Sequence, residues 1–401
     1  MEELDVRVLY ENYHRKIAEI SLDFKRYLYN RINWEARIIC IEGARGVGKT
    51  TMLLQNILAT YDDIDETLYA SLDDLWFADH TLMELTDWAY RHGIRRLYLD
   101  EVHRYDLWAQ SLKNIFDSYP KMSIVYTGSS LLKMSKAKAD LSRRQTSYLL
   151  NGLSFREFLD LEGVVNFEPL TLDELLGRHR AIAMEVTKEL SVAKWFEQYL
   201  RHGYYPFYRE NLADFPQRLR ETVQAVIDND LPAVENMTQE TLQKVRKLLM
   251  IISKNVPFEP KMSELWQQLS TSNDLGLKML YSLDRARILA LLTAEAKTYK
   301  HLSKPAKIFL GDTNLMYALC PRVDKGNERE TFFYNQLHVD HEITSPNKGD
   351  FMADDRYLFE VGGRNKKVSQ IADIPDSYLA VDDTETGYGN RIPLWLFGFL
   401  Y

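Results

Sequence analysis

Eight consecutive residues near the start of the chain have the composition of a phosphate-binding loop. Residues 43–50 read GARGVGKT, which matches G-x-x-x-x-G-K-[ST], and they follow an apolar run and precede a helical stretch. Glycines let the backbone turn so that its N–H groups face an anion at a helix N-terminus, where the helix dipole also favours negative charge. We therefore expect the phosphates of a nucleotide to contact Gly43, Ala44, Arg45, Gly46, Val47, Gly48, Lys49, Thr50 and Thr51.

The chemistry of phosphoryl transfer assigns roles to individual side chains in and after this loop. Lys49 is expected to pair with the β and γ phosphates of ATP, and the Thr50 hydroxyl to bind Mg²⁺. A second apolar strand, in the segment LYLDE, ends at Asp100, whose carboxylate should reach the same magnesium at the edge of the sheet. Glu101 follows directly, where it can orient the attacking water or accept its proton.

Two further segments end at or follow this predicted sheet edge. The third apolar run ends in YTGSS, where Thr127 or Ser129 could contact the γ phosphate or the water, or could simply be polar strand ends. The segment KMSKAKADLSRR then has five Lys and Arg residues and a single acid. Arg143 or Arg144 could act as an arginine finger, within the chain or toward a neighbouring copy, because a guanidinium suits spread phosphoryl charge. A solvated basic face is the alternative.

These residues need a scaffold, and the hydrophobic pattern predicts a parallel sheet. Three apolar runs alternate with helical stretches; the runs are residues 36–43, 95–101 and 122–130, and the helical stretches are 81–92 and 108–119. Strands that alternate with helices require crossover connections, which produce a parallel sheet. Residues 10–31 are expected to form an amphipathic opening helix. The first 155 residues are therefore predicted to form an α/β domain of the P-loop NTPase type.

The rest of the chain is expected to form three more domains. Residues 156–235 have the composition of a helical lid or linker. Residues 236–300 contain three helical stretches and the short strand RILALL, which suggests a winged helix. Residues 301–401 mix strands with a helix around 329–337 and suggest a small α/β domain; the expected strands are AKIFLGD, RYLFEVGG, SYLAVDD and IPLWLFGFLY.

The order of these motifs resembles a known family. IEGARGVGKTT, RRLYLDEVHRYDLWAQSLKNIFD, MSIVYTGSS and DLSRRQTSYLLNGLSFREFL are similar to segments of the AAA-type bacterial and archaeal ATPases with a C-terminal domain of unassigned function. The resemblance implies ATP binding, ATP hydrolysis and a restriction-nuclease-like fold at the end of the chain. The family usually has Gly-Arg where this chain has Ser142 and Arg143, which leaves open whether Arg143 or Arg144 is the functional arginine.

A nuclease of the restriction-enzyme type would bind a divalent ion through acids of the last domain. The residues expected to hold that ion are Glu330, Asp350 and Glu360. Such sites need a lysine two residues after the second acid, where this chain has Gly362. Lys366 lies about 13 Å farther along an extended strand and reaches the ion only if Gly362 and Gly363 fold the chain back. Gln370 is a further candidate.

Charge favours a docking or regulatory role for this last domain over DNA cleavage. The chain has a net charge of −8, and residues 301–401 contain eleven Lys and Arg against fifteen Asp and Glu. Surfaces that handle polyanions are normally basic. In the predicted winged helix, the third helix begins with Asp274 and reaches its first cation only at Lys278, so a packing or lid role is favoured over DNA reading.

Three functions therefore remain open from the residues alone. The leading hypothesis is an ATP-binding and ATP-hydrolysing switch whose protein partner the sequence does not reveal. The alternatives are an ATP-controlled, metal-dependent nuclease that acts on DNA, and a protein-binding module that ATP locks without hydrolysis. No apolar run approaches the ~18 residues that span a bilayer, so no membrane partner and a cytoplasmic location are expected. Assembly into a homo-oligomer stays open.

Overall fold

The computed structural model describes residues 5–128, 141, 143–232, 237–255, 261–294, 304–366, 371 and 373–401. The chain forms two compact units, Met1–Asn151 and Gly152–Tyr401. The segments predicted as helical linker, winged helix and C-terminal domain all lie in the second unit, and their division into separate domains remains a prediction. Among the helices of the described residues, none is both long and apolar enough to cross a membrane.

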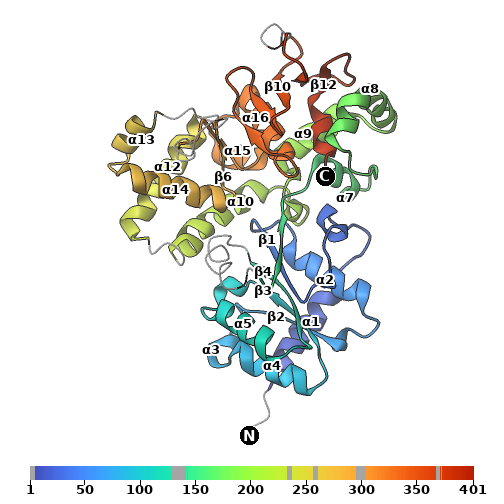
Figure 1. Ribbon diagram of the computed structural model, residues 1–401, viewed down its shortest axis with the longest axis vertical. Coiled ribbons are helices and arrows are strands. Elements are labelled where there is room, and N and C mark those ends of the chain that lie inside the picture. Colours follow the sequence, from blue (N-terminus) through green and yellow to red (C-terminus); the bar gives the residue numbers. More distant parts are fainter. Residues whose placement is uncertain are drawn as a thin grey trace. The chain divides into compact units, whose positions relative to one another are not determined.

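The first unit is built on a five-stranded parallel sheet with the order β2-β3-β4-β1-β5 (Figure 1). Strands β1 Ile38–Gly43, β3 Arg96–Asp100 and β4 Ser123–Gly128 confirm the three predicted runs. The edge strands β2 Thr67–Ser71 and β5 Thr146–Leu150 are additional. Because parallel strands end at the same sheet edge, β1, β3 and β4 bring the predicted site segments together.

Helices lie on both faces of this sheet. Helices α1 Arg7–Ala18 and α2 Lys49–Thr60 lie on one side, and α4 Leu82–Arg91 and α5 Trp108–Ser118 on the other, near the short α3 Trp76–Asp79 (Figure 1). In α5 the buried residues Trp108, Leu112 and Ile115 recur at helical spacing, so one stripe of the helix packs onto the core.

The predicted opening helix over residues 10–31 is wrong in its second half. Helix α1 ends at Ala18, and a single 3-10 turn, Tyr27–Asn30, follows. Between them the Ser21 hydroxyl donates to the Asp23 carboxylate at 2.7 Å and accepts the Asp23 backbone N–H at 3.0 Å. Such local side-chain hydrogen bonds compete with helical ones and favour a turn.

The second unit begins with helices and continues as a compact helical body. Helices α7 Phe155–Leu161, α8 Leu172–Glu189, α9 Val192–Gln198 and α10 Phe215–Ala225 come first, with one π-helical turn, Tyr199–Gly203, directly after α9. The start of α8 is set by a capping box, in which Thr171 and Glu174 satisfy each other's backbone N–H groups. A 3-10 turn, Pro206–Arg209, and a second π-helical turn, Val226–Asp230, complete this region.

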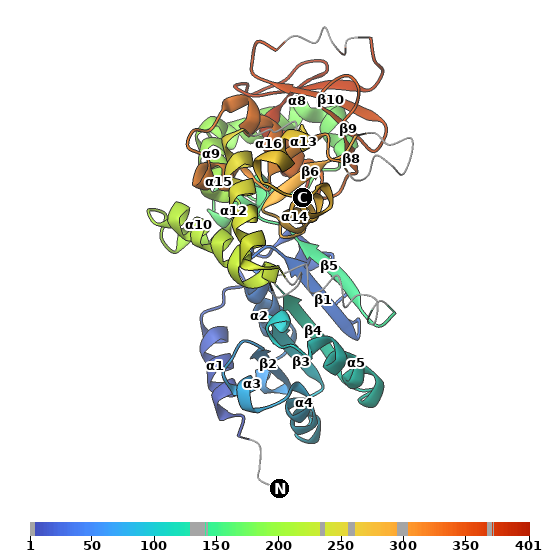
Figure 2. The same ribbon diagram turned by 90° about the vertical axis from the view of Figure 1, so that its left-hand side faces the viewer.

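Three helices and a two-stranded antiparallel ladder follow. Helices α12 Gln239–Lys254, α13 Met262–Gln268 and α14 Asn273–Arg285 agree with the helical stretches expected at residues 241–254, 261–269 and 274–286. They gather near β6 Leu289–Leu292 (Figure 2). The partner of β6 is β7 Lys307–Leu310, from the segment assigned to the last domain. Three helices with such a ladder are compatible with a winged helix, which remains a prediction.

A second five-stranded sheet, with the order β12-β11-β10-β9-β8, occupies the end of the chain. It contains β8 Ile343–Thr344, β9 Phe351–Ala353, β10 Tyr357–Gly362, β11 Ser377–Val381 and β12 Arg391–Pro393, with α15 Thr313–Leu319 and α16 Lys325–Leu337 before it. The predicted strand IPLWLFGFLY is wrong after Pro393, because Leu394–Phe399 form a 3-10 helix. Apolar runs that are buried all round do not distinguish a strand from a helix.

A buried polar cluster joins α15 to the π-helical turn after α9. The Asn314 amide donates to the carbonyl oxygens of Tyr199 and Leu200 at 3.1 and 3.0 Å. Asp312, the N-cap of α15, accepts the Leu315 N–H and the Tyr205 hydroxyl, both at 2.8 Å. Burial raises the pKa of Asp312 to about 7, although these hydrogen bonds oppose the shift.

Asp312 should therefore make the protein less stable as the pH rises from 5 to 8. In this range the unfolded aspartate has already lost its proton, whereas the folded one retains it up to a pKa of about 7. Asp312→Asn stays neutral, so its stability relative to the unmodified protein should rise by about 2 to 3 kcal/mol between pH 5 and pH 8. Denaturant unfolding at both pH values measures this change. Asp324→Asn, at the exposed N-cap of α16, is the matched control, and equal responses of the two variants would contradict the assignment.

Candidate functional site

The predicted phosphate loop lies between β1 and α2, with a backbone that only glycines allow. Gly46 and Gly48 have φ angles of +85° and +96°, in the left-handed region that favours glycine. A Cβ atom on Gly43 would lie 2.5 Å from the carbonyl oxygen of Leu150 on β5. Glycine is thus needed twice for backbone conformation and once for close packing, and successive N–H groups in such a turn form an anion-binding concavity.

Arg26, a buried arginine that was not expected from the sequence to belong to the site, hydrogen-bonds to this loop. Arg26 is 4% exposed, and its guanidinium donates to the carbonyl oxygen of Val47 at 2.5 Å and to that of Asn151 at 2.8 Å. It therefore ties the loop to the end of β5. In the sequence, Arg26 is one of several basic residues of an apparent amphipathic stretch, and nothing in its spacing indicates this contact.

Lys49 and Thr50, the predicted phosphate-pairing lysine and a predicted magnesium ligand, lie at the start of α2, and Asp100 lies at the end of β3. The Lys49 ammonium is buried and donates to the carbonyl oxygens of Gly43 and Ala44 at 3.1 and 2.9 Å. The Thr50 hydroxyl donates to the Asp100 carboxylate at 2.6 Å. A hydroxyl and a carboxylate oxygen in direct contact are hard oxygen ligands of the kind that Mg²⁺ prefers, so these residues fit that ion.

Asp100 is the centre of a buried hydrogen-bond network. Its carboxylate is 2% exposed and accepts hydrogen bonds from the hydroxyls of Thr127 and, at 2.9 Å, Tyr69. Burial, together with the Asp100 charge, raises the pKa of the Tyr69 phenol, which keeps it a donor. Lys16 on α1 donates to the Tyr69 oxygen at 3.0 Å. Sequence reasoning missed Tyr69, because it lies on an edge strand that the pattern did not reveal.

Glu101 combines a half-buried position with an unusual backbone. Its φ angle is +50°, which is uncommon for a residue with a side chain. The side chain is 24% exposed, and one oxygen lies 3.4 Å from Nε2 of the buried His103. Its backbone N–H donates to Thr127 at 3.3 Å and to Asp100 at 3.2 Å. The Thr127 hydroxyl therefore hydrogen-bonds both to the Asp100 carboxylate and to the Glu101 backbone N–H. His103, in the turn after Glu101, lies beside the Glu101 carboxylate.

The two candidate arginines have different surroundings. Arg144 forms an ion pair with Asp117 on α5, with Nε 3.2 Å from the carboxylate, and lies over the Phe116 ring. Arg143 is exposed to solvent. Arg45 and Thr51 are also exposed, as the rim of a binding loop requires. Ser129 and Gln370, the remaining predicted positions, lie outside the described residues.

Each of the three acids of the predicted nuclease site has a lysine ammonium nearby, and two of the acids share the same lysine. Lys307 on β7 lies 3.0 Å from Glu330 of α16 and 3.7 Å from Asp350. Lys366 lies 2.7 Å from Glu360 of β10. Burial and the neighbouring Asp350 charge raise the pKa of Glu330. Within the described ranges, no three His, Cys, Asp or Glu side chains form a group that could hold a metal ion, and binding of a metal by these acids remains a prediction.

Lys366 reaches Glu360 because the chain turns back at the two glycines. The Lys366 N–H donates to the Gly363 carbonyl oxygen at 2.9 Å. A Cβ atom on Gly362 would lie 2.7 to 2.8 Å from three carbons of the Lys366 side chain. The lysine thus fills the space that a side chain at residue 362 would take. The second oxygen of Glu360, which is 3% exposed, has no hydrogen-bond partner in the described part of the chain.

Comparisons with known proteins support the class of the first unit. Residues 35–159 match the model of a protein family described as "AAA domain". Together with the loop geometry and the parallel sheet, this match gives the first unit the fold of a P-loop NTPase domain.

The likenesses over longer ranges come from distant proteins. Uncharacterized protein MJ1637 of Methanocaldococcus jannaschii is 27% identical over 290 residues, which are 69% of this chain and 61% of that protein. The chain therefore spans less than two thirds of this relative's length. The Walker-type ATPase paby2304 of Pyrococcus abyssi aligns over 74% of this chain and 95% of its own, with 13% identity and a TM-score of 0.42. AMPPCP-bound DnaA from Aquifex aeolicus aligns over 76% and 92%, with 15% identity and a TM-score of 0.26.

Proposed function

We propose that the first unit binds ATP with Mg²⁺ and hydrolyses it, and that the second unit responds by engaging or releasing a protein partner. The observation that best supports the proposal is the hydrogen bond between the Thr50 hydroxyl and the Asp100 carboxylate, next to the glycine-containing phosphate loop. Glu101 follows Asp100 directly in the chain. Mg²⁺, when bound to these oxygens, would offset the charge of the β and γ phosphates.

The residues then divide the work of hydrolysis. Lys49, now held by loop carbonyls, would turn to the phosphates, whose charge attracts it more strongly than neutral carbonyl oxygens do. Glu101, half-buried beside His103, would orient water and accept its proton. Arg143 is exposed and is the better candidate for an arginine offered to a neighbouring copy, because Arg144 already pairs with Asp117.

Replacing Lys49 tests nucleotide binding directly. Lys49→Ala should weaken ATP binding by about 10- to 100-fold, because a charge-assisted contact to the phosphates is lost. Equilibrium titration with a fluorescent ATP analogue measures the affinity. Lys121→Ala, which changes an exposed lysine of the same unit, should leave it unchanged. Equal affinity of all three proteins would mean that nucleotide binds elsewhere or not at all.

A second candidate function, an ATP-controlled metal-dependent nuclease acting on DNA, is favoured by the position of Lys366. Its ammonium lies where the missing lysine of such a site would act, beside Glu360. Against this stands the net negative charge of residues 301–401. Two lysines already pair with the three acids, so a divalent ion would have to displace them.

Cleavage assays separate the two proposals for the last domain. As a docking module, it should leave plasmid and single-stranded DNA intact with Mg²⁺ or Mn²⁺, with or without ATP. Cleavage that is lost in Asp350→Ala/Glu360→Ala protein and in Lys366→Met protein would establish the nuclease instead. Asp355→Ala, at an exposed acid of the same sheet region, controls for nonspecific effects of charge removal.

A further inference from the structure

A small cavity of about 210 Å³ in the second unit has a lining without acidic side chains. It lies between the turn after β10, the end of β11 and the loop that leads into β12. The residues that line it are Arg364, Val381, Thr384, Thr386, Gly387, Tyr388 and Arg391. Its charge is thus opposite to that of residues 301–401, which contain fifteen Asp and Glu against eleven Lys and Arg. The volume is below the ~300 Å³ at which pockets for whole small molecules begin, so it suits a single functional group.

Arg391 is held in place by the neighbouring turn, residues 363–366. Its guanidinium donates to the carbonyl oxygen of Lys366 at 3.0 Å and to that of Arg364 at 2.9 Å. Tyr388 and Arg391 also exchange backbone hydrogen bonds at 3.0 Å. A guanidinium has five N–H donors, so these two carbonyl oxygens leave donors for a ligand. Because the carbonyl oxygens are neutral, they hold Arg391 without offsetting its charge.

Arg364 adds a second positive charge to the same lining. Its side chain is exposed, and among the described residues its guanidinium has neither a hydrogen-bond partner nor an ion pair. In the same part of the chain, no carboxylate lies within ion-pair distance of Arg391. Like charges that line one cavity repel each other, and an anion bound between them would relieve this repulsion.

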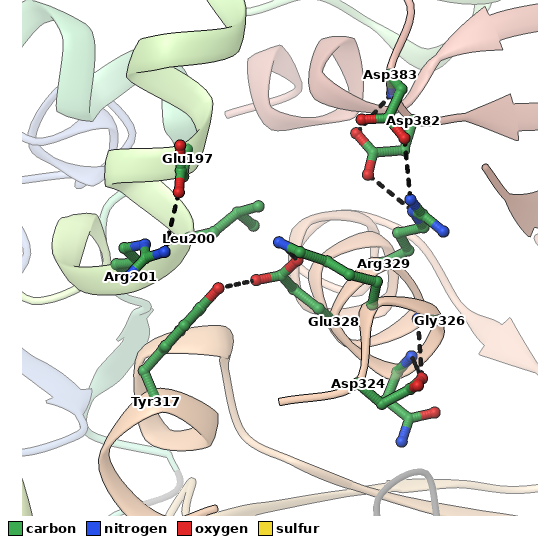
Figure 3. A network of polar contacts seen from close by, with 12 residues as sticks. Glu197, Leu200, Arg201, Tyr317, Asp324, Gly326, Glu328, Arg329, Asp382 and Asp383 are labelled. Atoms are coloured by element: carbon green, nitrogen blue, oxygen red, sulfur yellow. Dashed lines mark hydrogen bonds and ion pairs between the residues drawn. The ribbon is translucent and has the colours of Figure 1, made fainter. Parts of the chain in front are cut away.

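The two acids at the start of the loop are paired with a different arginine. Arg329 on α16 donates to Asp382 at 2.8 Å and to Asp383 at 3.2 Å (Figure 3). A Cβ atom on Gly363 would lie 3.1 Å from the Arg329 guanidinium, so Arg329 also packs against the turn. Arg329 therefore supports both the loop and the turn, and it pairs with acids that could otherwise neutralise the two arginines of the cavity.

The donors of the cavity fit a phosphoryl group better than a carboxylate. A phosphorylated side chain has a charge of about −1.5 to −2 at pH 7 and three strong acceptor oxygens. A carboxylate has a single negative charge and two oxygens. Two guanidinium groups match the larger charge, and Thr386 in the same lining adds a hydroxyl donor.

The surroundings favour one phosphoryl group over a strand of nucleic acid. Glu385, between the two threonines of the lining, is exposed, so a strand would bring further phosphates close to acidic side chains. A peptide with one phosphorylated side chain avoids this cost. Tyr388 is 67% exposed, and the Arg391 guanidinium lies 5.7 Å from the centroid of its ring. The ring therefore offers an apolar surface beside the charge, on which a neighbouring peptide side chain can pack.

We propose that this cavity binds a phosphorylated side chain of a protein partner. The phosphoryl oxygens accept hydrogen bonds from Arg364 and Arg391, and the adjacent residue of the partner packs on Tyr388. The inference rests on the proposed docking role of the second unit but not on ATP hydrolysis. It names the chemical group by which the partner is recognised.

Fluorescence anisotropy with a labelled phosphopeptide, Gly-Ala-phosphothreonine-Leu-Gly, tests the proposal on the full chain. We expect saturable binding at least about tenfold tighter than for the same peptide with unmodified threonine. Arg364→Gln should weaken binding about tenfold, whereas Arg322→Gln, at an exposed arginine that does not line the cavity, should not. No saturable binding up to about 1 mM phosphopeptide, or equal affinity of the two variants, would overturn the proposal.

A labelled single-stranded oligothymidylate with a 5′ phosphate distinguishes a protein partner from a nucleic acid. We expect it to bind at least about tenfold more weakly than the phosphopeptide, because its other phosphates meet acidic side chains. Binding as tight as that of the phosphopeptide, or tighter, would overturn the assignment to a protein partner. If Tyr388→Ala also abolished that binding, base stacking on the ring would identify a nucleic acid site.

The melting temperature of Arg364→Gln protein separates binding from folding. Arg364 is exposed and its guanidinium contacts no partner among the described residues, so the melting temperature should not change. Weaker binding only together with a lower melting temperature would overturn the direct role of Arg364. These measurements contain no nucleotide, so a protein that does not hydrolyse ATP can still bind the phosphopeptide, and the two proposals fail independently.

Discussion

Replacing Glu101 with glutamine should lower ATP turnover at least about a hundredfold while leaving ATP affinity within a factor of two or three. Glutamine has nearly the same shape, so the loop and the Asp100 network persist, but it cannot accept a proton from water. Loss of a positioned general base typically costs 10² to 10⁴ in rate. Phosphate release measures turnover, and titration with an ATP analogue measures affinity.

The control for this variant is an acid of the same unit outside the site. Glu11→Gln changes an exposed residue of α1 and should turn over ATP like the unmodified chain. If Glu101→Gln protein also retained full turnover, the basic group would be elsewhere. A loss of affinity together with turnover would indicate that Glu101 holds the fold of the loop instead.

Removing the Asp100 carboxylate should damage both stability and catalysis. Three hydroxyls, of Thr50, Tyr69 and Thr127, and one backbone N–H donate to this buried group. Asp100→Ala leaves buried donors without an acceptor, which costs about 1–3 kcal/mol for each one that finds no new partner. We therefore expect a loss of about 3 kcal/mol or more in the free energy of unfolding, together with loss of Mg²⁺-dependent hydrolysis.

Asp100→Asn distinguishes the two effects. The amide keeps one acceptor oxygen and offers donors that the neighbouring hydroxyls can accept, so most of the stability should return. The negative charge that Mg²⁺ needs does not return, so hydrolysis should stay lost. Thermal unfolding and phosphate release on both variants supply the comparison. An alanine variant as stable as the unmodified protein, or an active asparagine variant, would contradict the central position given to Asp100.

The phosphate loop was predictable because its residues are contiguous and its role is a backbone property. The motif in residues 43–50 specifies its own turns, and Asp100 follows from the rule that parallel strands end at one edge. Arg26, Tyr69 and His103 were not predictable in the same way. Each of these residues acts through a contact with a partner that is distant in the sequence or buried. A single sequence does not reveal such contacts.

Residues 301–401 show the same difference between local and long-range information. Helix α16 and strands β10 and β11 follow from hydrophobic patterning. The pairing of Lys307 with Glu330 depends on β7 joining β6, and Lys366 reaches Glu360 only through a turn that an extended strand would not make. The sequence shows that two glycines would permit this turn. In the structure the turn is present, and the Lys366 side chain packs over Gly362.

The most direct test of the account is to count phosphates released per protein molecule with excess ATP and Mg²⁺. The unmodified chain should release many phosphates per site, and Lys49→Ala protein should release none above background. Release of no more than one phosphate per site, with tight ATP binding, would contradict this prediction. The first unit would then be a module that changes conformation on binding ATP without turnover, and Glu101 would not act as a catalytic base.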